Sequence, residues 1–131
     1  MLRYALPALA LFGLGALVGA QTAPLLGDRS TPLRPLGGEG NVGISNATLR
    51  DQSEVRALRV VIEPGGTRAL HEHADVRFHL FVPISDPMTL DLEAGPTQVE
   101  PWHPYFLAGG TRHGFRNTGT EAVEVMEIFI R

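Results

Sequence analysis

The sequence contains no cysteine and no lysine, because all eleven of its basic residues are arginine. These absences exclude disulfides, zinc–cysteine sites, thiolate nucleophiles and Schiff-base lysines. The formal net charge is −3, and no basic stripe is present that could follow a phosphate backbone. We therefore expect no nucleic-acid partner, and a chemistry confined to His, Asp, Glu, Arg, Tyr, Ser and Thr.

The first twenty residues have the pattern of a targeting segment. Arg3 precedes an apolar run from about Tyr4 to Ala20, which ends in small residues. This pattern is typical of a secretory signal peptide (residues 1–20) with cleavage after Ala20. The alternative is a transmembrane anchor, but the run is short for a span and is interrupted by one proline and three glycines. We predict an exported protein, periplasmic or extracellular, with no stable membrane insertion after cleavage.

The remaining chain divides into an arm and one domain. Residues 21–45 contain three prolines and the run GGEGNVG, with little apolar periodicity. This composition is typical of a linker or N-terminal arm. Residues 46–131 are enough for a single domain.

From Asn46 onward, short strand patterns alternate with Gly/Pro turns, and no helix pattern is present. Within 55–66, Leu58, Val60 and Ile62 share one face, and we expect this strand to stop at Pro64-Gly65-Gly66. Further strands are expected at 68–74, 76–84, 88–96, 97–101, 105–109 and 121–130. A spacing of roughly 8–12 residues predicts an all-β antiparallel sandwich or barrel.

Three of the five histidines lie within nine residues. His71 and His73 are two apart on an expected strand, so their side chains point the same way, about 6.6 Å apart along the chain. Two imidazoles can converge from this distance on one ion, at roughly 2.1 Å per bond. Neutral imidazole suits Fe, Mn, Zn, Ni or Cu. We therefore predict a site for one divalent transition metal, the alternative being a half-buried strand that is rich in histidine.

The sequence around these histidines resembles the two motifs of the cupin family. The first motif runs glycine, five residues, His-x-His, then glutamate after three or four residues; the second ends in His-x-x-x-Asn. The residues that match are Gly65, His71, His73, Gly110, His113 and Asn117. The resemblance covers nearly all of residues 46–131 and implies a double-stranded β-helix, or jelly-roll barrel. In that fold His113 completes a three-histidine metal site at the barrel mouth.

The chain departs from the family at the motif glutamate, whose position falls on Arg77 or Phe78. The strand register leaves two alternatives open. If Arg77 points inward, so does His79, which then serves as a fourth metal ligand or orients one. If Phe78 points inward, Leu80 and Val82 fill the core, and Arg77 and His79 face outward.

An inward Arg77 requires an anionic partner, because a guanidinium cannot ligate a cation and stays charged. The functional hypothesis is that Arg77 binds a substrate carboxylate whose other end reaches the metal. The alternative is a structural ion pair with Asp75. His103, which stands between two prolines, is expected in a surface loop.

The resemblance implies two classes of function. Cupins with three histidines and no glutamate resemble oxygen-dependent dioxygenases that act on thiols or diketones. The chain is then a metal-dependent dioxygenase for a small carboxylate-bearing substrate, or a non-catalytic module that binds a small molecule or a metal. The resemblance also implies a homodimer, formed through a sheet face or a swapped 21–45 arm.

Overall fold

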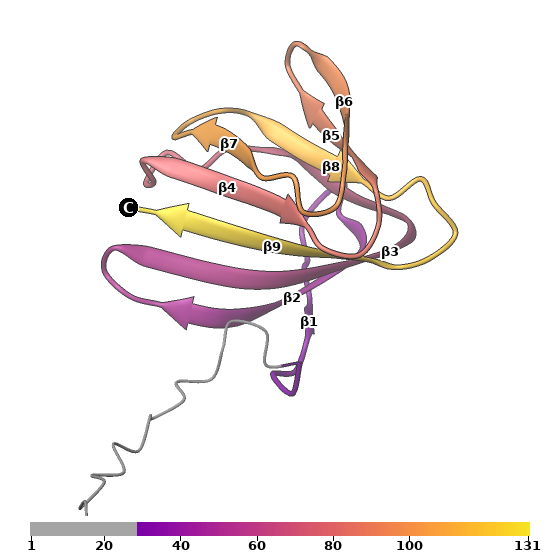
Figure 1. Cartoon of the computed structure of the whole chain (residues 1–131), viewed down its shortest axis with the longest axis horizontal. Coiled ribbons are helices and arrows are strands. Elements are labelled where there is room, and N and C mark those ends of the chain that lie inside the picture. Colours follow the sequence, from indigo (N-terminus) through magenta and orange to yellow (C-terminus); the bar gives the residue numbers. More distant parts are fainter. Residues whose placement is uncertain (1–28) are drawn as a thin grey trace, which may run out of the picture.

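The computed structural model describes residues 29–131, so the predicted signal peptide and the beginning of the arm lie outside the described residues. In the described part the chain forms one nine-stranded sheet (Figure 1). The strands are β1 (Arg34–Pro35), β2 (Val42–Asp51), β3 (Val55–His71), β4 (Phe78–Pro83), β5 (Met88–Leu92), β6 (Gly95–Val99), β7 (Tyr105–Ala108), β8 (His113–Arg116) and β9 (Val123–Ile130). Within residues 29–131 no helix is long and apolar enough to cross a membrane.

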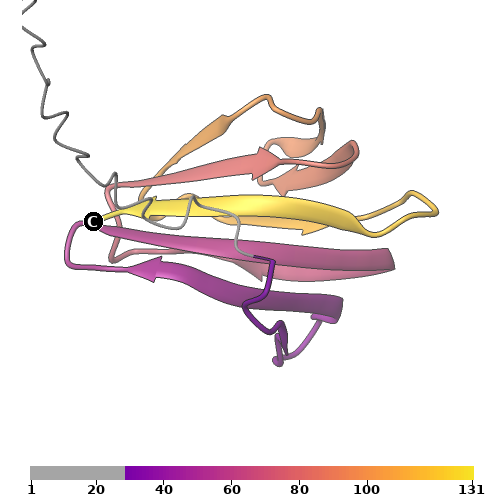
Figure 2. The ribbon, with the colours of Figure 1, turned by 60° about the horizontal axis from the view of Figure 1, so that its bottom comes forward.

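The sheet curls into a nearly closed antiparallel barrel. Its strands follow the order β6-β5-β8-β3-β9-β4-β7, while β2 also pairs with β3, and β1 with β2. Figure 2 shows β2, β3, β9 and β4 side by side along one wall. This arrangement confirms the predicted all-β jelly-roll barrel.

Strand β3 joins the two halves of the barrel. The sequence predicted that it stops at Pro64-Gly65-Gly66, but the strand continues through these residues. Its first half pairs with β2 and β9, and its second half with β8. Gly65 has a φ of +74°, and a Cβ on Gly66 would lie 2.7 Å from the carbonyl oxygen of Glu63. The two glycines therefore let the strand bend sharply without ending.

The core is formed by the inward side chains of these strands. In β3, Leu58, Val60 and Ile62 alternate inward as the period of two predicts. The largest apolar side chains of the core that are almost fully buried are Ile62, Phe81, Met88, Leu90 and Phe115. Each such residue stabilises the fold by about 1.5–3 kcal/mol relative to an exposed position.

The folded part begins earlier than the sequence indicated. We predicted the barrel from residue 46, but β2 begins at Val42 and β1 pairs with it. Ile44 is buried, and Leu36 packs against the core. These apolar residues stand singly among glycines and prolines, so no periodic signal marked them. Pairing with β3 places this segment in the sheet.

Candidate metal centre

Three histidines from neighbouring segments converge inside the barrel. His71 ends β3 and His113 begins β8, and the two are direct partners in the antiparallel ladder. His73 follows β3 by two residues. The candidate ligand atoms of the three side chains all lie within 4.8 Å of one another. The ladder thus brings together residues that are 42 positions apart in the sequence.

Backbone carbonyls determine which ring nitrogen of His71 and His113 carries the proton. The Nδ1 atom of His71 lies 2.9 Å from the carbonyl oxygen of Ala69, and that of His113 lies 2.8 Å from the carbonyl oxygen of Thr111. Because a carbonyl only accepts, Nδ1 donates in both rings and Nε2 keeps its lone pair. A metal-binding histidine is held in this way.

The candidate ligand nitrogens are spaced as ligands of one ion. The Nε2 atoms of His71 and His73 are 3.1 Å apart. Two nitrogens bound at about 2.1 Å and at right angles to each other would be separated by roughly 3.0 Å. The Nε2 atom of His113 is buried and has no hydrogen-bond partner among residues 29–131. The residues present therefore fit a divalent transition metal with three nitrogen ligands and open positions.

Burial lowers the pKa of each clustered histidine. It brings the pKa of His71 and His73 to about 4 and that of His79 to about 2, and it lowers the pKa of His113 as well. Positive charge on neighbouring groups, including Arg68, adds to this effect on His71, His73 and His113. All four rings are consequently neutral at pH 7, which is the form that binds a metal.

The structure decides the register of β4. His79 is 1% exposed and points into the barrel, whereas Phe78 is 45% exposed. The alternative with an inward Phe78 is therefore wrong. The ring of His79 stacks on Phe129 with centroids 4.4 Å apart, and its centroid lies 4.8 Å from that of His113. Neither of its nitrogens has a hydrogen-bond partner in the described part of the chain.

Glu127 is a buried carboxyl beside His79 that the sequence analysis missed. Its Oε1 atom lies 3.6 Å from Nε2 of His79. Burial raises the pKa of Glu127 to about 7, against the opposing charges of Arg68 and Arg56. Because His79 is neutral, this contact is no ion pair at neutral pH. The alternation of β9 places Glu127 on the inward face, and this signal was available in the sequence.

A cavity of about 190 Å³ opens beside His71 and His73, and its charged residues are Arg56, Arg68 and Glu127. Burial lowers the pKa of Arg68 from its ordinary value, although the guanidinium stays charged. Two guanidinium groups therefore face one carboxyl that is only partly ionised near pH 7. The cavity has a surplus of positive charge, which suits a small anion.

Arg68 is held in position by Asn41, a residue of the predicted N-terminal arm. It donates from Nη1 to the side-chain oxygen of Asn41 over 3.0 Å, and the same oxygen accepts from the backbone N–H of Ala69. Arg56 lies over the ring of Phe129, 6.0 Å from its centroid. Neither arginine was predicted from the sequence, although Arg68 stands only three residues before His71.

Arg77 and His103 do not line this cavity. Arg77 is exposed just before β4, where its backbone N–H donates to the carbonyl of Ile130 and its carbonyl accepts from Gly109. The alternation of β4 does not extend to this residue, so an inward His79 does not bring Arg77 inward with it. His103 is exposed in the loop between β6 and β7, as expected.

Comparison with known proteins supports the fold and little else. No protein-family model and no curated protein sequence matches the chain. Among solved structures, a predicted oxalate decarboxylase from Thermotoga maritima is 18% identical, with a TM-score of 0.72 over 81% of this chain and 97% of that one. The polyketide cyclase RemF from Streptomyces resistomycificus is 17% identical, with a TM-score of 0.69 over 77% and 74%. A cupin domain from Bordetella pertussis Tohama I is 22% identical, with a TM-score of 0.60 over 72% and 99%.

Proposed function

We propose that this chain, which has the cupin fold, holds a divalent transition metal at His71, His73 and His113 and binds a small carboxylate-bearing molecule beside it. The observation that carries the proposal is the group of three ring nitrogens within 4.8 Å, two of them with their tautomer set by backbone carbonyls. Such an ion, when bound, supplies a Lewis acid or a centre for oxygen chemistry. The candidates are Fe, Mn, Zn, Ni and Cu.

The carboxylate assignment rests on the charges that line the cavity. Arg68 and Arg56 face the same space as His71 and His73. A planar guanidinium binds a carboxylate through two parallel hydrogen bonds. Arg77, which the sequence analysis predicted for this role, is exposed and outside the cavity lining. The proposal therefore gives the role to Arg68, with Arg56 as a second positive group.

We propose a metal-dependent oxidoreductase of the dioxygenase type as the first candidate activity. In its favour, His71 and His73 line the cavity that Arg56 and Arg68 also line, and Glu127 can hold or release a proton at Oε1 near neutral pH. The second candidate is a non-catalytic binding module. The fold cannot choose between them, because the similar structures include a polyketide cyclase and a cupin domain of a transcriptional regulator.

Metal content tests the first half of the proposal. Protein purified without a histidine tag should contain close to one equivalent of metal by plasma mass spectrometry. The variants His71→Ala, His73→Ala and His113→Ala should each lose most of it, because each lacks one ligand. His103→Ala is the matched control and should retain the metal. Full occupancy in all three variants would refute the site.

Calorimetry with a panel of small carboxylates tests the second half. Arg68→Ala should weaken the binding of those that bind by about tenfold or more. Arg77→Ala is the control and should bind as the wild type does. If Arg77→Ala weakened carboxylate binding and Arg68→Ala did not, Arg77 would be the residue that binds the carboxylate. Oxygen uptake by the metal-loaded protein with thiols, diketones and carboxylates then separates the dioxygenase from the binding module.

We also propose that the chain is exported, since residues 1–20 have the composition of a signal peptide. The mature protein should then begin at Gln21. Intact-mass measurement of the secreted or periplasmic form checks this. Membrane-bound protein that retains Met1 would overturn it.

A further inference from the structure

The glycine-rich segment of residues 37–43, whose composition is typical of a linker, forms a defined loop against the barrel. The backbone N–H of Leu36 donates to the carbonyl of Ile44 over 2.9 Å and closes the base of this loop. Gly38 and Gly40 have φ values of +111° and +75°, in the region that favours glycine. The glycines therefore specify a turn rather than a loose connection.

Asn41 follows this turn, and its side-chain amide is bonded at both ends. Its Nδ2 atom donates to the carbonyl of Gly37 over 2.7 Å. Its Oδ1 atom accepts from Nη1 of Arg68 and from the backbone N–H of Ala69, each over 3.0 Å. A rotated amide would place N–H groups against these two donors, so the partners determine the orientation of the side chain.

Ala69 lies where the ladder between β3 and β8 is irregular. Arg68 and His71 have partner residues in β8, but a register shift between them leaves Ala69 without one. The pairing of β2 with β3 ends at Val42, one residue after Asn41. The amide of Asn41 therefore supplies the acceptor that a strand would otherwise provide for the N–H of Ala69.

Ala69 in turn orients a candidate metal ligand. Its carbonyl accepts from Nδ1 of His71 over 2.9 Å. Asn41 thus contacts the guanidinium of Arg68 directly and acts on the imidazole of His71 through the backbone of Ala69. A change at Asn41 should consequently affect both groups.

Asn41 orients Arg68 without neutralising it, because an amide carries no charge. The bond uses Nη1, and among residues 29–131 no acceptor is bonded to Nε or Nη2 of Arg68. In Arg116 the corresponding nitrogens, Nε and Nη2, hold the carboxylate of Asp91 as a bidentate pair, with both distances 2.7 Å. The Nε–Nη2 edge of Arg68 is therefore available for the same kind of contact with a ligand.

We infer that Asn41 is a positioning residue of the candidate site. It holds Arg68 so that the Nε–Nη2 edge binds the ligand carboxylate, and it fixes the backbone whose carbonyl orients His71. The inference rests on the proposed function, which supplies the carboxylate and the metal. It makes the glycine-rich loop of residues 37–43 part of the binding site.

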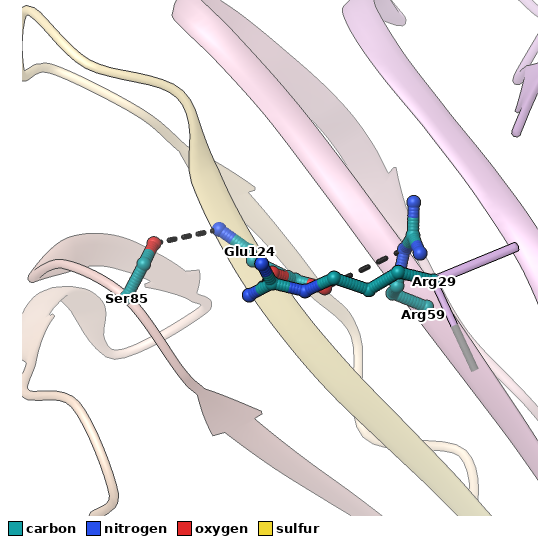
Figure 3. Close-up of polar contacts among 4 residues, drawn as sticks. All are labelled: Arg29, Arg59, Ser85 and Glu124. Carbon is teal, nitrogen blue, oxygen red and sulfur yellow. Dashed lines mark hydrogen bonds and ion pairs between the residues drawn. The ribbon is translucent and has the colours of Figure 1, made fainter. Parts of the chain in front are cut away.

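The arm also contacts the barrel on its outer face, and this contact provides a matched control. Figure 3 shows Arg29 beside Glu124 of β9, whose carboxylate lies 3.0 Å from Arg29 and 3.5 Å from Arg59. The backbone N–H of Glu124 donates to the hydroxyl of Ser85. The side chain of Arg29 is 77% exposed, so its ion pair contributes little to stability. Arg29→Ala therefore removes a contact of the arm and leaves the cavity lining intact.

Calorimetry with acetate, malonate and pyruvate on the metal-loaded full chain tests the first part of the inference. Asn41→Ala should weaken the binding of those that bind the wild type by about tenfold or more, as loss of a residue that orients a ligand group does. Arg29→Ala should bind them as the wild type does. Asn41→Asp keeps an acceptor for Arg68 and Ala69 but adds a negative charge, so it should lose carboxylate affinity and retain the metal.

The result separates the inference from the proposed function. If Arg68→Ala weakens carboxylate binding and Asn41→Ala does not, the proposed function stands and the positioning role of Asn41 toward Arg68 is wrong. If no carboxylate binds the wild type, the carboxylate assignment is refuted, and the positioning role toward Arg68 is refuted with it.

Proton NMR of the zinc-loaded protein tests the second part. The Nδ1 protons of His71 and His113, which are donated to the carbonyls of Ala69 and Thr111, should give two slowly exchanging resonances. In Asn41→Ala the His71 proton should shift and exchange about tenfold faster or more, because the backbone of Ala69 has lost its anchor. The His113 proton should stay unchanged and shows that the variant is folded. A His71 proton that Asn41→Ala leaves unchanged would overturn the link through Ala69.

Discussion

At the residue scale, the side chain of His79 suits metal binding but destabilises the metal-free fold. The side chain is 1% exposed, and neither ring nitrogen has a hydrogen-bond partner in residues 29–131. A buried polar group without a partner destabilises a fold by about 1–3 kcal/mol. The ring centroids of His79 and His113 are 4.8 Å apart. The same unpaired nitrogens are therefore suited to contact an ion or its ligands.

We predict that His79→Leu stabilises the metal-free protein by about 1–2 kcal/mol, because an apolar side chain of similar volume removes the unsatisfied nitrogens. Urea unfolding in the presence of a chelator measures this. In the same variant, metal affinity should fall, but less than in His113→Ala. The reason is that His113 is one of the three histidines whose ligand atoms converge. A destabilised metal-free His79→Leu protein would contradict this reading of the site.

The buried histidines also make the metal-free protein sensitive to acid. The pKa of His71 and His73 is about 4 in the folded protein, while an unfolded histidine titrates near pH 6.5. Between these values the unfolded chain binds more protons, so stability rises with pH. The pKa of Glu127, raised to about 7 from 4.5, acts in the opposite direction between pH 4.5 and 7, since the folded protein then holds the extra proton.

We therefore predict that the unfolding free energy of the metal-free protein falls as the pH drops from 6.5 to 4, by an amount on the order of a few kcal/mol. Solvent screening of the partly exposed His71 and His73 limits the size of the change. In Glu127→Gln the opposing contribution is gone, so the rise in stability from pH 4.5 to 6.5 should be steeper. Chemical unfolding at a series of pH values measures both curves. A flat wild-type curve would mean that the histidines are solvated.

At the scale of the element, the bend of β3 positions the metal centre. The second half of the strand carries Arg68 and His71, and its direction is set at Gly65 and Gly66. Asn117 secures this bend, because its backbone N–H donates to the carbonyl of Gly66 and its carbonyl accepts from Gly65. A local change at the bend is therefore transmitted to the ligands.

Gly66→Ala should lower the unfolding free energy by about 1–3 kcal/mol. Its Cβ would meet the carbonyl oxygens of Glu63 and Gly43 at 2.7 Å and 2.8 Å, and these backbone atoms cannot easily move aside. Metal affinity should fall as well, because the strand beyond the bend is displaced. Gly37→Ala is the matched control: it has open space around the added Cβ and should be neutral or slightly stabilising. Equal stability of the two variants would show that the bend tolerates a side chain.

At the scale of the whole molecule, metal binding and folding are coupled. The three ligands come from the end of β3, the residues after it and the start of β8, so they converge only in the folded barrel. An ion that binds the folded state alone stabilises it by mass action, by about 2.7 kcal/mol at a concentration one hundred times the dissociation constant.

For a domain of about 100 residues, this stabilisation should raise the midpoint of thermal unfolding by about 10 °C or more. Calorimetry with the metal that the purified protein contains measures the shift, and a chelator should reverse it. His113→Ala should show little or no shift. A shift of wild-type size in that variant would mean that the ion binds elsewhere.

The sequence by itself determined the class of fold and the candidate ligands, because both depend on local patterns. Alternating apolar residues with Gly/Pro turns indicate a β-barrel, and His71 and His73 share a face at a spacing of two. Only the tertiary structure decided that His79 points inward, that Arg68 rather than Arg77 faces the cavity, and that burial there raises the pKa of Glu127. Those outcomes depend on strand register, on the path of the loop before β4 and on desolvation by distant segments, which no local pattern contains.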